Sequence, residues 1–173
     1  MNKKSGRNCF YENYPAWIVL ASNLVSLLIY AAGAFVLYQV GIVWVALYVI
    51  YILLLEMRLV RNHCVDCYYY GKVCAFGQGK LSALLFKKGI AKNFAGKKVT
   101  WIDLAPDFLV SLIPLVAGIL LLIKSFNWLV AGMLALILIL SFAGNAFVRG
   151  QLACKHCKQR EFGCPAEKLF SKK

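Results

Sequence analysis

Six cysteines fall into two groups with the same spacing. Both groups follow the pattern C-x2-C-x6-C: Cys64, Cys67 and Cys74 in the first, and Cys154, Cys157 and Cys164 in the second. A C-x2-C turn lets two thiolates reach one ion, and for this reason it recurs in zinc and iron–sulfur sites. A histidine accompanies each group, His63 before Cys64 and His156 inside the second C-x2-C. The two groups therefore predict a metal or redox site.

These ligands can combine in several ways. Each group with its histidine could form a separate Cys3His zinc site, although the adjacent His63 and Cys64 are poorly placed to face one ion. Alternatively, the two C-x2-C pairs form one shared four-thiolate site. A cubane iron–sulfur cluster held by three cysteines and one outside ligand is a third arrangement, but neither group has the closer spacing of ferredoxins. We expect zinc, with an iron–sulfur cluster as the alternative cofactor.

The same cysteines could instead carry out thiol–disulfide chemistry. Lysines and arginines near them favour the thiolate, which is the nucleophilic form. No Walker loop, HExxH, GxSxG or dinucleotide-binding motif occurs, and only seven carboxylates are available for acid–base chemistry. The alternative function is therefore a membrane redox protein that passes electrons or thiol equivalents between the cytosol and a membrane carrier. A small transporter is a second alternative, weakened by the lack of charges deep in the apolar segments.

The elements that position these cysteines are long apolar segments. Of the 173 residues, 61% are hydrophobic and 16% are charged, and a soluble domain of this length could not bury so much apolar surface. Because a bilayer core needs about 20 helical residues to cross it, the sequence predicts four transmembrane helices. Their uncharged cores are residues 16–37, 41–55, 108–123 and 128–148. The expected fold class is an all-α integral membrane protein.

The net charge of +13 is distributed in a way that predicts topology. Of the 20 basic residues, 19 lie before the first apolar segment, between the second and third, or after the fourth, and only Lys124 does not. By the positive-inside rule, both termini and the central loop are cytoplasmic in a multi-pass protein of the cell membrane. The basic residues are then explained by topology and by anionic lipid, and no nucleic-acid partner is expected.

The chain divides into two transmembrane hairpins, each followed by a cysteine-containing cytoplasmic segment. Pro15 and Pro106 suit the first turn of the helix that opens each hairpin. Two hairpins entering from the same side are consistent with a parallel internal repeat, whose axis would bring the cysteine groups together. The predicted parts are an N-terminal segment (1–15), hairpin 1 (16–60), a cytoplasmic loop (61–105), hairpin 2 (106–148) and a cytoplasmic tail (149–173).

Three further features lie on the cytoplasmic side. Residues 81–89 combine leucines at helical spacing with lysines, which predicts a short interfacial helix ended by Gly89. Glu56, one turn from the interface, is expected to form an ion pair with Arg58 or Arg61. Cys9 has no assigned role. Together these features favour a small membrane protein with a cytoplasmic cysteine-ligated metal site, structural or regulatory, that could also dock a cytoplasmic protein partner.

Overall fold

The computed structural model describes residues 10–90, 94, 96 and 100–165, and this part of the chain contains helices and no strand. Cys9 and the tail beyond residue 165 lie outside the described residues. Four helical spans are long and apolar enough to cross a membrane, which confirms the predicted all-helical class and number of spans. These spans are Ala16–Tyr38, Ile42–Asp66, Trp101–Lys124 and Trp128–His156.

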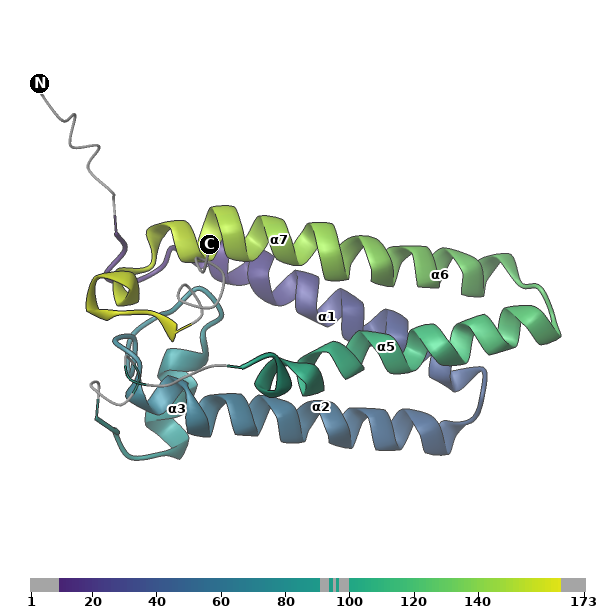
Figure 1. The fold of residues 1–173 in the computed structure, drawn as a ribbon, viewed down its shortest axis with the longest axis horizontal. Helices are drawn as coiled ribbons and strands as arrows, with labels where there is room; N and C mark the ends of the chain where they lie inside the picture. Colours follow the sequence, from purple (N-terminus) through teal and green to yellow (C-terminus); the bar gives the residue numbers. More distant parts are fainter. Residues whose placement is uncertain (1–9, 91–93, 95, 97–99, 166–173) are drawn as a thin grey trace, which may run out of the picture.

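The individual helices have the following bounds (Figure 1). The spans comprise α1 (Ala16–Tyr38), α2 (Ile42–Asn62), α5 (Trp101–Lys124), and a fourth helix made of α6 (Trp128–Ile139), η2 (Leu140–Gly144), α7 (Asn145–Phe147) and η3 (Val148–Ala153). Shorter helices are η1 (Cys64–Asp66), α3 (Gln78–Leu85), η4 (Cys154–His156) and η5 (Lys158–Phe162).

Both cysteine groups lie at the same end of the four-helix bundle (Figure 1). Short connections join α1 to α2 and α5 to α6 at the opposite end. The end that holds residues 10–15, 63–90 and 154–165 is called the cysteine end below. Helix α1 packs against α2, α5 and α6, and it therefore links the other three long helices.

Two apolar clusters hold the long helices together. One joins α1 to α6 through Val36, Val130 and Ile137, and the other joins α1, α2 and α5 around Leu37 and Tyr48. Outward-facing positions are apolar as well: the exposed side chains include Leu20, Leu54 and Leu120. A helix surface that is apolar on all sides needs lipid around it. This distribution supports a bilayer environment.

A close approach of three helices occurs at Gly33 of α1. A Cβ atom at this position would lie 2.5 Å from the Tyr48 hydroxyl oxygen of α2 and 3.2 Å from the Pro114 ring of α5. Small residues at such crossings allow membrane helices to pack closely without a hydrophobic driving force. Gly33 therefore sets the spacing in the middle of the bundle.

Helix α5 begins earlier than the sequence suggested. The prediction that Pro106 occupies the first turn is wrong, because the helix starts at Trp101 and contains Pro106. Thr100 and Asp103 form a capping box: the Thr100 N–H donates to the Asp103 carboxylate at 2.9 Å. This cap satisfies free N–H groups of the first turn and extends the helix towards the cysteine end.

The fourth span is longer than the uncharged segment 128–148 and is not uniformly α-helical. It widens into π-helix at η2 and again at η3 before it reaches the second cysteine group. Within η2 the Ser141 hydroxyl lies 2.8 Å from the Ser111 hydroxyl of α5, and this hydrogen bond joins two helices in an apolar region. Such π-helical turns commonly accompany functional sites.

The segment predicted to form an interfacial helix does contain a helix, but its bounds are shifted. Helix α3 spans Gln78–Leu85, follows Gly77 with φ of +75°, and ends before Gly89. Gly89 instead donates a backbone hydrogen bond to Val65 at 3.0 Å and ties the chain back to the first cysteine group. Leu84 is 81% exposed, as expected of a side chain that faces a membrane surface.

Candidate metal centre

The two C-x2-C turns have the same local conformation. Each begins a short 3₁₀ helix, and in each the second cysteine N–H donates to the carbonyl of the first at 3.3 Å. The next turn is also equivalent. The N–H of Tyr70 donates to the carbonyl of Cys67 at 3.0 Å, and the N–H of Arg160 donates to the carbonyl of Cys157 at 3.2 Å. The repeated spacing in sequence is therefore accompanied by a repeated backbone path.

Backbone N–H groups act on the ionisation of the second cysteines. Against the larger effect of burial, which raises both pKa values, the N–H of Tyr69 lowers the pKa of Cys67, and that of Gln159, at the same offset, lowers the pKa of Cys157. In addition, the N–H of Gly79 donates to Cys74 Sγ at 3.4 Å. Hydrogen bonds of this kind favour the negatively charged thiolate and tune metal–thiolate bonds.

One hydrophobic cluster brings the two cysteine groups together. Its buried members come from the N-terminal segment, α1, the first cysteine group and the end of the fourth helix: Tyr14, Ile18, Tyr69, Ala75 and Ala153. Cys67, Cys74 and Cys157 pack against this cluster. The Tyr14 hydroxyl donates to the carbonyl of Ala153 at 2.5 Å and fastens the N-terminal segment to the fourth helix.

The thiols are close enough to influence one another's ionisation. Burial raises the pKa of Cys67 to about 11, with further upward contributions from Cys74 and Cys164. Burial likewise raises the pKa of Cys157 to about 12, and Cys67, Cys154 and Cys164 add to it. Both thiols are therefore protonated at neutral pH in the metal-free protein, and neither is an activated nucleophile.

A chain of hydrogen bonds connects the first cysteine group to the helices. Cys64 Sγ donates to Gln78 Oε1 at 3.6 Å, and Gln78 Nε2 donates to Glu56 Oε2 at 2.6 Å. The other carboxylate oxygen of Glu56 accepts a 2.8 Å hydrogen bond from Tyr30. The expected ion pair between Glu56 and Arg58 or Arg61 is wrong, because Glu56 faces α1 and α3 instead.

Glu12 links the two cysteine groups from outside. Its carboxylate pairs with Lys72 of the first group at 3.1 Å and with Lys158 of the second, and it also accepts from the Tyr68 hydroxyl. Glu12 is about half exposed, so these pairs position the segments more than they stabilise them.

Sequence reasoning did not assign roles to Gln78, Glu12 or the three tyrosines after Cys67. The run Tyr68–Tyr70 could have indicated a set of hydrogen bonds at this end, since each hydroxyl binds a different part of it. Tyr69 donates to the carbonyl of Tyr11 at 2.6 Å, and Tyr70 donates to that of Phe86 at 2.7 Å.

The other four predicted ligands are His63, His156, Cys154 and Cys164. The His156 ring lies 5.0 Å from that of Tyr11, and the His63 ring meets Phe94 edge-on at 6.5 Å. Cys154 is exposed, and Cys164 is half-buried within electrostatic range of Cys67 and Cys157. Over the described ranges, no three side chains of His, Cys, Asp or Glu converge closely enough to hold a metal ion. No disulfide bond joins any two of the six described cysteines.

No protein-family model matches the chain, and comparisons with curated proteins and with solved structures find no match.

Proposed function

We propose that this protein is a small multi-pass membrane protein that binds a metal ion, zinc in our assignment, through cysteines of its two C-x2-C turns. The observation that carries the proposal is that two turns of the same spacing and similar conformation pack against one cluster, and that at the same offset in each a backbone N–H favours the thiolate of the second cysteine. Metal–thiolate sites use this combination.

The raised pKa values of Cys67 and Cys157 argue against thiol–disulfide exchange. Exchange needs a thiolate before the reaction begins, whereas a divalent metal ion displaces the proton as it binds. The four C-x2-C sulfurs do not converge closely enough in the described residues to hold one ion. A shared site therefore requires the side chains to rotate and the two turns to approach each other.

The metal would fix the loop and the tail relative to the bundle. In a membrane protein with this charge distribution, we place the cysteine end in the cytoplasm, where thiols stay reduced and a partner protein could dock. The orientation is tested with a membrane-impermeant thiol reagent on intact cells. Cys154 is exposed and should react only after permeabilisation. Its labelling from outside would overturn the orientation.

Metal content tests the function directly. Protein purified anaerobically should contain one zinc per chain, and either Cys67→Ser or Cys157→Ser should lose it. Cys9→Ser removes a thiol outside both groups and is the matched control, which should retain the metal. If each variant instead loses half of the metal, the chain has two separate sites and not one shared site. A metal-free wild type whose thiols cycle with disulfides would reject metal binding and support the redox alternative.

A further inference from the structure

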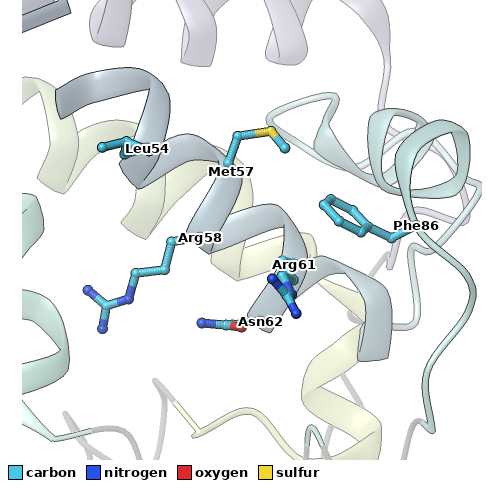
Figure 2. Close-up of a pocket in the computed structure, with 6 residues that line it drawn as sticks. All are labelled: Leu54, Met57, Arg58, Arg61, Asn62 and Phe86. Carbon is cyan, nitrogen blue, oxygen red and sulfur yellow. The ribbon is translucent and has the colours of Figure 1, made fainter. Parts of the chain in front are cut away.

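A pocket lies beside the last turns of α2, on the outer surface of the bundle near the cysteine end (Figure 2). It has a volume of about 480 Å³ and is lined by Leu54, Met57, Arg58, Arg61, Asn62 and Phe86. This volume is within the range of roughly 300–1,000 Å³ typical of small-ligand pockets. None of these residues belongs to the candidate metal centre.

The pocket carries two positive charges that are not neutralised by an ion pair. Arg58 and Arg61 lie one turn apart and are both exposed, and neither forms a hydrogen bond or ion pair with another described residue. Asp103 and Asp107 of α5 lie within electrostatic range of Arg58 but do not pair with it. The guanidinium group of each arginine can donate hydrogen bonds to a phosphate or carboxylate group in the pocket.

The rest of the lining is apolar and continues a lipid-facing surface. Leu53, Leu54 and Met57 are exposed on α2 immediately before Arg58, and Phe86 closes the pocket from the end of α3. Where an exposed apolar helix surface gives way to arginines, the helix passes from the hydrocarbon core to the level of the lipid phosphates. The two halves of the pocket therefore match the two halves of a phospholipid.

We propose that this pocket binds an anionic phospholipid, with its phosphate at Arg58 and Arg61 and the start of an acyl chain along Leu54 and Met57. A zwitterionic choline lipid is disfavoured, because it adds a positive charge next to two arginines. The site is independent of the metal centre, and it anchors α2 and the end of α3 to the same lipid.

Native mass spectrometry of the full-length protein in detergent tests this proposal, with phosphatidylglycerol and phosphatidylcholine as probes. Phosphatidylglycerol should bind the wild type more tightly, and Arg58→Gln/Arg61→Gln should weaken it by about tenfold or more, since each basic residue contributes a factor of roughly five. Lys80→Gln/Lys155→Gln removes two exposed charges at the same end and should leave the affinity unchanged. Phe86→Ala should also weaken binding.

If both double variants lose the same affinity for phosphatidylglycerol, binding depends on the overall charge of this end and not on the pocket. That result would overturn the proposal. Glycerol phosphate, which is water-soluble and has no acyl chain, serves as a competitor in the same experiment. If it competes fully at concentrations similar to those of the lipid, the ligand is a free phosphate compound and the lipid assignment fails. Weak competition by glycerol phosphate, with retained folding of every variant, supports a lipid.

Discussion

The hydroxyl of Tyr48 on α2 donates a 2.9 Å hydrogen bond to the carbonyl oxygen of Val110 on α5. Val110 lies four residues before Pro114, which has no N–H group to offer that carbonyl. A tyrosine from a neighbouring helix therefore supplies the donor that the proline removes, in a region without water.

This relationship predicts the effect of Tyr48→Phe. Loss of the hydroxyl leaves the Val110 carbonyl without a donor and should destabilise the protein by about 1 kcal/mol. Thermal unfolding in lipid nanodiscs measures the change. Tyr38→Phe, at an exposed tyrosine, is the control and should have no effect. Equal stability of Tyr48→Phe and the wild type would show that this carbonyl is satisfied in another way.

The Gln78 amide joins Cys64 to Glu56, and its removal should expose the thiol. In Gln78→Leu, Cys64 loses its acceptor and Glu56 loses a 2.6 Å hydrogen bond, so α3 should detach from α2 more often. Maleimide labelling of Cys64 in protein stripped of metal with a chelator, followed by peptide mass spectrometry, should become severalfold faster. Lys80→Leu changes an exposed neighbour on the same helix and should not alter the rate. An unchanged rate in Gln78→Leu would mean that the bond does not hold α3.

The stability of the metal-free protein should depend on alkaline pH. Burial raises the pKa of Cys67 from 9.0 to about 11 and that of Cys157 to about 12. A group with a raised folded-state pKa contributes stability that is complete below its unfolded pKa and is lost as the pH rises through the folded value. The melting temperature should therefore fall from about pH 9 upwards.

The double variant Cys67→Ala/Cys157→Ala separates this effect from tyrosine ionisation. Burial also raises the pKa of Tyr69, from 10.0 to about 12, so its contribution is lost only above pH 10. In the double variant the loss of stability between about pH 9 and pH 12 should be smaller than in the wild type. Identical pH profiles would show that the two thiols are not buried as described.

Membrane contact of α3 is tested at Leu84, whose side chain is 81% exposed. In water Leu84→Asp would cost little, but at a bilayer surface it forfeits roughly 1.5–3 kcal/mol of apolar burial. Hydrogen–deuterium exchange of residues 81–86 in nanodiscs should accelerate in Leu84→Asp and not in Lys80→Gln. If Leu84→Asp accelerates exchange equally with lipid and without lipid, α3 is not an interfacial helix.

The amino-acid sequence predicts the long helices well, because each is dictated by local hydrophobicity. The first span was expected at 16–37 and is Ala16–Tyr38. Errors arose where other local or tertiary interactions extend a helix. The capping box of Thr100 and Asp103 carries α5 five residues upstream of Pro106, and the fourth helix continues past Arg149 as π-helix.

The candidate site was predictable only in part. Spacing alone picked out Cys67 and Cys157, since a C-x2-C turn is a local structure. The partnership of Glu56 with Gln78 depends on how α3 folds back against α2, and no pattern in the sequence encodes that placement. Sequence proximity suggested Arg58 instead, and this is why the expected ion pair was wrong.

Tyr14 meets Ala153, and Glu12 meets Lys158, across almost the whole length of the described chain. During synthesis the first cysteine group leaves the ribosome long before its partners in the fourth helix and the tail exist. Until two more helices are made and inserted, Cys67 and Cys74 lack the part of their cluster that Ala153 and Cys157 supply. Capture of an ion, or oxidation of a thiol, in that interval would occur before the second group arrives, so the order of translation makes the first group the earlier and more vulnerable half.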